Sequence, residues 1–250
     1  MKANRAVVKL GTNSITNEDG RLNEELISSI VEQVVSVSDQ WNVLLVTSGA
    51  VAAGLTLIDE KRYDETTNRQ IYASVGQVQL MKMYASKFAE HNQVVAQMLT
   101  TKDDFTNRDH YLNMKNCLES LFKENIIPIM NENDFVAIEE LMFTDNDELA
   151  GLVSQMLNAD KLIVLTNVEG VLDENGVIVR EFNYDDPVPN HILSAKSKSS
   201  FGKGGIQTKF KMAQEVAENG SEVYICNSIF KDVISRILAG EHIGTKFNPR

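Results

Sequence analysis

Short apolar runs alternate with longer amphipathic stretches along this chain of 250 residues. The runs have the length and the β-branched content of buried strands, whereas the stretches between them repeat apolar residues at helical spacing. We predict strands at 6–8, 41–46, 94–99, 126–130, 161–165 and 223–226. We predict helices that begin near Asn23, Gly49 and Asp145 and after the glycines of 202–205, and others at 68–89, 108–123 and 233–238.

This alternation predicts a three-layer α/β/α sandwich whose central sheet is mainly parallel. There is no internal repeat and no clear linker, so we expect residues 1–250 to form a single domain. An Asn-Gly pair at 175–176 predicts a hairpin turn, and residues 183–200, with two prolines and a Ser/Lys cluster, predict a mobile surface segment. Polar residues that follow parallel strands should gather at one edge of the sheet, where the carboxyl ends of the strands meet.

Composition excludes several classes of function. The formal net charge of −11 argues against nucleic acid as a partner, because phosphate-backbone binding needs a basic face. Cys117 and Cys226 form no C-x-x-C pair and the four histidines lack zinc spacing, so we predict neither a disulfide framework nor a metal site. The N-terminal apolar run is too short for a signal peptide, and no run reaches membrane-spanning length. We therefore expect a cytoplasmic protein with no membrane partner.

The stretch 131–148, NENDFVAIEELMFTDNDE, is the strongest candidate for a binding site. A run of acidic residues is more often a solvated loop. Here, however, asparagines alternate with carboxylates, which places amide donors beside acceptors in the mixture that holds a zwitterion. Apolar residues in the same stretch predict that it folds back onto the core; they are Phe135, Val136, Leu141, Met142 and Phe143.

Three glycine-containing turns are candidates for binding anions. Lys9 precedes the turn at Gly11, where it either reaches a phosphate or extends along the sheet edge to solvent. Ser48 and Gly49 lie between a strand and a helix, an arrangement that lets an anion approach the backbone. The segment 202–209, GKGGIQTK, satisfies neither the Walker A pattern nor G-x-G-x-x-G, yet its glycines and lysines at a helix start still predict a phosphate-binding loop.

Five motifs together resemble the glutamate 5-kinases, a branch of the amino-acid kinase family. They are VKLGTN at 8–13, VTSGA at 46–50, NEND at 131–134, FTDNDELAG at 143–151 and GKGGIQTK at 202–209. Their order and spacing match over essentially the whole chain. The resemblance implies ATP-dependent phosphorylation of the γ-carboxylate of L-glutamate, the first step towards proline, with Mg²⁺ accompanying the nucleotide.

The resemblance also implies roles for individual residues. Lys9 and Lys209 would contact the ATP phosphates, and Asp147 would hold the two lysines in position. Glutamate would bind at Ser48, Gly49, Asn131, Asp134 and Asn146. The nucleotide would contact Gly11, Thr166, Asn167, Lys203, Gly204, Gly205, Ile206, Gln207 and Thr208 together with the two lysines. The family usually has Asp at the position of Asn167 and Thr or Arg at that of Lys203.

The expected chemistry needs charge neutralisation more than proton transfer. A glutamate side chain has a pKa of about 4.3, so the nucleophile is already ionised at neutral pH and no general base is required. Bringing this carboxylate to a polyanion depends on positive charge and alignment. Two alternatives stay open: a kinase of aspartate, N-acetylglutamate or carbamate, and a non-catalytic small-molecule sensor on the same fold. The pairing of NEND with TDND favours free glutamate over the other acceptors.

Further expectations follow from the resemblance alone. Many members carry a C-terminal PUA domain, and we expect this chain to be the form without one. We also expect a homo-oligomer, either dimer or tetramer, and feedback inhibition by proline.

Overall fold

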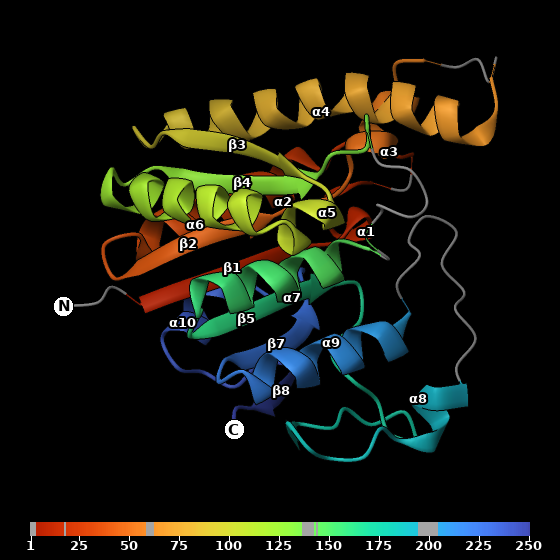
Figure 1. Cartoon of the computed structure of the whole chain (residues 1–250). Coiled ribbons are helices and arrows are strands. Elements are labelled where there is room, and N and C mark those ends of the chain that lie inside the picture. The colour runs from red at the N-terminus through yellow and green to blue at the C-terminus, as the bar shows by residue number, and fades with distance from the viewer. Residues whose placement is uncertain (1–3, 18, 59–62, 137–142, 144, 195–204) are drawn as a thin grey trace.

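A computed structural model describes residues 4–17, 19–58, 63–136, 143, 145–194 and 205–250. Within these residues eight strands form one sheet (Figure 1). The strands are β1 (Asn4–Leu10), β2 (Trp41–Val46), β3 (Val95–Thr100), β4 (Ile127–Glu132), β5 (Lys161–Thr166), β6 (Glu181–Asn183), β7 (Glu222–Asn227) and β8 (Thr245–Asn248).

The sheet has the strand order β3-β4-β2-β1-β5-β7-β8-β6. Every pair from β3 to β7 is parallel, whereas β8 runs antiparallel to β7 and β6 runs parallel to β8. The predicted α/β/α class with a mainly parallel sheet is therefore confirmed. Because β1 lies in the middle, the strands that follow it in the chain first extend the sheet on one side, up to β4, and then on the other, from β5.

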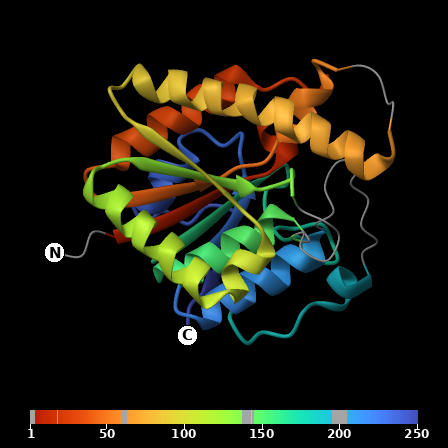
Figure 2. The same cartoon turned by 45° about the horizontal axis from the view of Figure 1, so that its top comes forward.

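Helices cover both faces of the sheet, as Figures 1 and 2 show. They are α1 (Thr12–Ile15), α2 (Glu24–Val37), α3 (Ala50–Leu55), α4 (Glu65–Ala89), α5 (Lys102–Thr106), α6 (Arg108–Lys123), α7 (Asn146–Leu157), α8 (Asn190–Ser194), α9 (Ile206–Glu218) and α10 (Val233–Leu238). One core cluster joins the sheet to α2, α4 and α10, and the other joins it to α6, α7 and α9. The central strands are apolar on both faces because both faces are covered.

Alternation along β1 shows how one strand serves both layers. Ala6, Val8 and Leu10 belong to the cluster beneath α2 and α4, while Val7 belongs to the cluster beneath α7 and α9. Successive side chains of a strand point to opposite faces. Lys9, two residues after Val7, therefore points towards the layer of α7 and α9.

The structure confirms the strands and long helices predicted from the apolar pattern, with shifts of a few residues at their ends. The predicted hairpin is also present, as an antiparallel bridge between Leu172 and Ile178. Residues 190–194 of the predicted surface segment form α8; Ile192 is buried, whereas the other residues of 183–193 are half-buried or exposed. Residues 195–200 of that segment lie outside the described residues. The pattern missed the short elements β6, β8, α1 and α5.

Local capping fixes where α7 begins. The Oδ1 atom of Asp145 accepts hydrogen bonds from the backbone N–H groups of Asp147 and Glu148, at 2.9 and 3.3 Å. This is the geometry of an N-cap carboxylate, which satisfies amide groups that have no partner within the helix. Since α7 packs against β1, β4 and β5, its first turn lies at the carboxyl edge of the sheet.

Candidate active site

A buried carboxylate joins two lysines at this edge. Asp147, in the first turn of α7, lies with Oδ1 2.5 Å from Nζ of Lys9 and with Oδ2 2.7 Å from Nζ of Lys209. The side chain of Asp147 is 1% exposed, and those of Lys9 and Lys209 are 6% and 14% exposed. Three elements that are distant in the sequence, β1, α7 and α9, thus place three charged groups in contact.

The pKa values of the two carboxylates in this turn are shifted in opposite directions. Burial alone would raise the pKa of Asp147, but Lys9 and Lys209 outweigh it and hold that pKa well below its usual range. Burial, together with the neighbouring charge of Asp147, raises the pKa of Asp145 to about 6, and the two lysines only partly oppose this rise. Asp147 therefore serves as a permanent counter-charge, which does not suit a group that must exchange protons.

The N-terminus of α9 faces the same region. Gly205 is its N-cap residue, and within the described chain no side chain caps this helix. The amide groups of a first helical turn attract anions. Those of α9 belong to Ile206, Gln207 and Thr208. Lys203 and Gly204, which the sequence also predicted to contact the nucleotide, lie outside the described residues.

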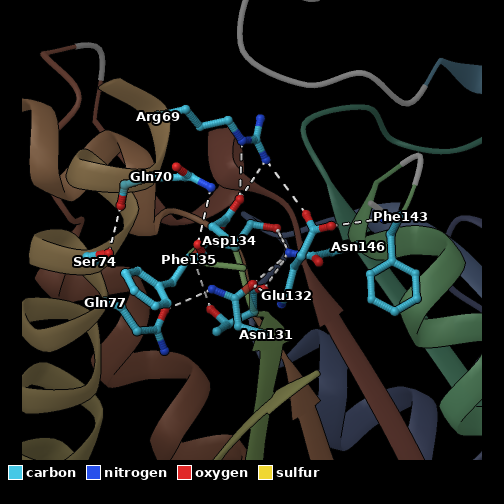
Figure 3. A network of polar contacts seen from close by, with 12 residues as sticks. Arg69, Gln70, Ser74, Gln77, Asn131, Glu132, Asp134, Phe135, Phe143 and Asn146 are labelled. Atoms are coloured by element: carbon cyan, nitrogen blue, oxygen red, sulfur yellow. Dashed lines mark hydrogen bonds and ion pairs between the residues drawn. The ribbon is translucent and has the colours of Figure 1, made fainter. Parts of the chain in front are cut away.

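The amide side chains of Gln77, Asn131 and Asn146 build a second cluster (Figure 3). Nδ2 of Asn146 donates to the backbone oxygen of Thr47, to Oγ of Ser48 and to Oδ1 of Asn131, at 2.7, 2.8 and 2.9 Å. Nδ2 of Asn131 in turn donates to Oε1 of Gln77 on α4. Oδ1 of Asn146 and Nε2 of Gln77 are buried and form no hydrogen bond within the described chain, so the cluster keeps an acceptor and a donor for a ligand.

Asn146 and Asp147 are consecutive residues, so the first turn of α7 connects the two clusters. One residue faces the amide cluster through Asn131, and the next holds Lys9 and Lys209. A molecule bound at the amide cluster therefore lies beside the positive charges. This adjacency is what a phosphoryl-transfer site requires.

Two glycines occupy tight places in the site. Gly49, the N-cap of α3, has a φ of +94°, and a Cβ atom there would meet Cδ1 of Ile15 at 3.0 Å. Its backbone conformation is thus one that other residues rarely adopt. Gly11 follows β1, where an added Cβ would lie 3.6 Å from Nζ of Lys9. A side chain at Gly11 would occupy the space next to that ammonium group.

Asp134 forms an ion pair that the sequence did not reveal. Nε and Nη2 of Arg69, on α4, donate to Oδ1 of Asp134 at 3.2 and 2.8 Å. Nη2 also lies 3.7 Å from Oε2 of Glu132, whose Oε1 accepts a hydrogen bond from the backbone N–H of Phe143. Arg69 and Gln77 are therefore additions to the predicted site, because no motif around α4 indicates that it reaches the loop after β4.

The prediction that this loop folds onto the core holds for Phe143, which is buried, and fails for Phe135 and Val136. Phe135 and Val136 are 69% and 48% exposed, because they lie in the turn that leaves β4. The backbone oxygen of Phe135 accepts a hydrogen bond from Gln70 of α4. Leu141 and Met142 lie outside the described residues.

On the other side of β1, hydrogen bonds join the loop that follows β5 to the loop that follows β7. Nδ2 of Asn227 donates to the backbone oxygen of Asn167 at 3.1 Å, and Oδ1 of Asn227 accepts from the N–H of Ile229. The N–H of Ser228 donates to the backbone oxygen of Thr166. Thr166 and Asn167 were predicted to face the nucleotide; Asn227, which fixes their loop, was missed.

The family model for the amino acid kinase family matches residues 4–227. This range includes both clusters of the site. The chain belongs to this family, in its glutamate 5-kinase branch. Curated proteins named glutamate 5-kinase resemble it along nearly its whole length: that of Bacteroides thetaiotaomicron is 38% identical over 98% of this chain and 70% of its own, and that of Chlorobaculum tepidum 41% identical over 97% and 68%. The glutamate 5-kinase of Clostridium acetobutylicum is 36% identical and is matched over 95% of its own length.

Solved structures of the same fold are more distant in sequence. The isopentenyl phosphate kinase of T. acidophilum superposes with a TM-score of 0.67 at 15% identity, covering 97% of this chain and 99% of that one. The UMP kinase of Ureaplasma parvum gives 0.63 at 13% identity, covering 98% and 99%. These likenesses establish the fold alone. Across the described helices, none combines the length and apolar character needed to cross a membrane.

Proposed function

We propose that this chain transfers the γ-phosphoryl group of ATP to the γ-carboxylate of L-glutamate, producing L-glutamyl 5-phosphate, the first step of proline biosynthesis. The observation that carries this proposal is the buried carboxylate of Asp147 shared by Lys9 and Lys209, directly beside the amide cluster. The names of the curated relatives support the same activity.

The reaction needs no proton to move. An oxygen of the acceptor carboxylate attacks the γ-phosphorus, and the bond from that phosphorus to the oxygen it shares with the β-phosphate breaks, so that ADP leaves with the electron pair. Lys9 and Lys209 would neutralise charge on the transferring group and on the leaving phosphate. Asp147 would hold both lysines in place without acting as a base, consistent with its low pKa.

The two substrates would bind on opposite sides of β1. Ser48, Gly49, Asn131, Asp134 and Asn146 would hold glutamate. Gly11, Thr166, Asn167 and the first turn of α9, Gly205 to Lys209, would hold the nucleotide, with Lys203 and Gly204 as further candidates. The amide groups at the N-terminus of α9, which no described side chain caps, fit the phosphates of ATP.

Mg²⁺ would reach the site with ATP. It retains several waters and phosphate oxygens as ligands and takes few from the protein. Oδ2 of Asp145 is buried and has no hydrogen-bond partner within the described chain. This carboxylate oxygen is therefore the candidate protein ligand for Mg²⁺. Bound Mg²⁺ would neutralise charge on the phosphates.

The proposal is tested by ADP release in the presence of MgATP and L-glutamate, with hydroxylamine added to trap the acyl phosphate as the γ-hydroxamate. Aspartate, N-acetylglutamate and carbamate serve as rival acceptors in the same assay. Faster turnover with one of these would assign the chain to a different acceptor. Ligand binding without ADP release would identify a sensor.

We further infer that proline inhibits by competing with glutamate. Proline has an α-carboxylate and a positively charged amine but no γ-carboxylate, so it could occupy the groups that hold glutamate and could not react. Initial rates at several glutamate concentrations, with and without proline, should show inhibition that disappears at saturating glutamate. Inhibition that persists there would place the proline site elsewhere.

Resemblance to the family also supports a cytoplasmic homo-oligomer, either a dimer or a tetramer. Light scattering after gel filtration would measure the oligomeric state.

A further inference from the structure

The ion pair of Arg69 and Asp134 leaves one nitrogen and one oxygen uncommitted (Figure 3). Both bonds from Arg69 go to Oδ1 of Asp134, from Nε and Nη2. Nη1 forms no hydrogen bond or ion pair with the residues that the structure describes, and Oδ2 of Asp134 forms none either. The side chain of Arg69 is 38% exposed, so part of it is accessible to a ligand.

The groups around this pair suit both ends of a zwitterion. Glu132, whose side chain is 7% exposed, lies 3.7 Å from Nη2 of Arg69 and adds a second carboxylate. One guanidinium thus faces two carboxylates, and Oδ2 of Asp134 is the oxygen that Arg69 leaves for an ammonium group. The two N–H groups on Nη1 remain for a carboxylate, and guanidinium groups bind carboxylates through their planar edge. An α-amino acid carries both groups on one carbon atom.

We propose that Arg69 is a specificity-determining residue that binds the α-carboxylate of the acceptor, while Asp134 binds the α-ammonium group of the same molecule. The inference rests on the proposed phosphorylation of glutamate and deepens it, because it names the side chain that distinguishes an amino acid from a simple carboxylic acid. Arg69 reaches this place from α4, and the amide cluster around Asn131 lies on the same side of the loop.

A purely structural role for Arg69 predicts a different result. If Arg69 only holds Asp134, its loss weakens every acceptor that carries an α-ammonium group to the same extent. If Arg69 contacts the α-carboxylate, its loss weakens glutamate much more than the α-amide of glutamate. The α-amide keeps the ammonium group and the reacting γ-carboxylate, and lacks only the negative charge that Arg69 would bind.

The experiment compares L-glutamate with its α-amide in the unaltered chain, in Arg69→Ala and in Arg69→Lys, by ADP release and by calorimetric binding. Arg236→Ala is the matched control, because Arg236, on α10, forms an exposed ion pair with Glu241. We expect Arg69→Ala to raise KM for glutamate about tenfold to a hundredfold, with a change at least about tenfold smaller for the α-amide. KM for ATP should stay constant. Arg69→Lys should give an intermediate effect, because it keeps the charge and loses the planar fork.

Equal losses for the two acceptors in Arg69→Ala would overturn the inference and leave the proposed function intact. Failure of the unaltered chain to release ADP with glutamate would instead overturn the proposed function, and the inference with it. Thermal unfolding identifies a variant that does not fold. Should Arg69→Ala unfold, the ratio measured with Arg69→Lys decides in the same way.

Discussion

The three charges at the centre of the site carry a net charge of about +1, from one carboxylate and two ammonium groups. The whole chain carries −11. Screening limits the reach of distant surface charges to about 8 Å at physiological salt. Buried groups in contact are screened much less, so the local positive charge governs the approach of the phosphates.

Removal of either lysine should therefore slow the chemical step. We expect Lys9→Ala and Lys209→Ala each to lower kcat by about two to three orders of magnitude, because one preorganised charge at a developing anion contributes on the order of 3–4 kcal/mol. KM for glutamate should change little, since the amide cluster holds the acceptor. Steady-state rates with glutamate and MgATP measure both quantities.

Lys246 provides the matched control for the lysine variants. Its ammonium group pairs with Glu222 at 2.6 Å, and its side chain is 19% exposed, so it resembles the active-site lysines in burial and pairing. Glu222 begins β7, at the opposite edge of the sheet. Lys246→Ala should keep kcat near the original value. Near-normal turnover in Lys9→Ala or Lys209→Ala would remove that lysine from the mechanism.

The two aspartates of the α7 turn should respond to pH in opposite directions. The pKa of Asp145 is raised from 3.8 to about 6, so the folded state binds its proton more tightly than the unfolded state, and its contribution to stability falls as pH rises through that window. The pKa of Asp147 is lowered, so its contribution is present above pH 3.8 and is lost as pH falls below that value.

Thermal unfolding between pH 4 and pH 8 tests the sign for Asp145, and unfolding below pH 4 tests the sign for Asp147. Asp145→Asn keeps an oxygen for the N-cap and should stabilise the protein at pH 7.5 by up to about 3 kcal/mol, with the gain shrinking towards pH 4. Asp147→Asn should destabilise it at pH 7.5, because two buried lysines lose their counter-charge. A stability change in Asp145→Asn that does not vary with pH would contradict the assignment.

Single residues also mark the limit of what the sequence predicts. Lys9, Lys209 and Asp147 stand in recognisable motifs, and the structure brings all three together. Arg69 and Gln77 stand in none, because an arginine or glutamine on an amphipathic helix is ordinary. Each gains significance only when α4 packs beside the loop after β4, a contact between segments more than 50 positions apart in the chain.

At the level of elements, the close packing of α3 against α4 positions the acceptor side of the site. A Cβ atom at Gly76 would lie 1.8 Å from the backbone oxygen of Ala50, and one at Gly54 would lie 1.9 Å from that of Tyr72. Only glycine allows the two backbones to come this close. Because α3 follows Ser48 and Gly49, while α4 carries Arg69 and Gln77, this contact sets the distance between the two halves of the acceptor side.

Gly76→Ala should force α3 and α4 apart. The clash is with backbone, which cannot move aside as a flexible side chain could, so we expect a loss of stability on the order of 1–3 kcal/mol and a higher KM for glutamate. Ser74→Ala, on an exposed position of the same helix, is the control and should change neither quantity. Thermal unfolding and acceptor kinetics on both variants give the comparison. An unchanged melting temperature in Gly76→Ala would show that the helices separate without cost.

Elements were predictable in proportion to their length and burial. The central strands are apolar on both faces and stand out as continuous runs. By contrast, β8 has only two buried residues, Thr245 and Phe247, and β6 has only three residues in total. Their pairing depends on the chain returning to the far edge of the sheet, beyond β7. No local pattern carries that information.

For the molecule as a whole, strand order divides the candidate site. β2 and β4 lie on one side of β1; Ser48 follows β2, and Asn131 lies in β4. β5 and β7 lie on the other side and contain Thr166 and Asn227. In α/β sheets, ligands bind at the carboxyl ends of the strands, in the crevice where the chain connections from two neighbouring strands run to opposite sides of the sheet. The sequence places polar residues after each strand, but it does not give the order of the strands, which follows from how the helices pack on both faces.

This division predicts that substitutions on the two sides of β1 affect different substrates. Asn131→Ala and Asp134→Ala should raise KM for glutamate about tenfold or more and leave KM for ATP nearly unchanged, because each removes a polar partner from the acceptor side. Asn227→Ala should do the reverse, since Asn227 fixes the backbone of Asn167. Initial rates with each substrate varied in turn give both constants.

The double variant Asn131→Ala with Asn227→Ala should combine the two effects additively, because the residues share no partner. A parallel rise of both constants in any single variant would contradict the division and indicate a general loss of structure.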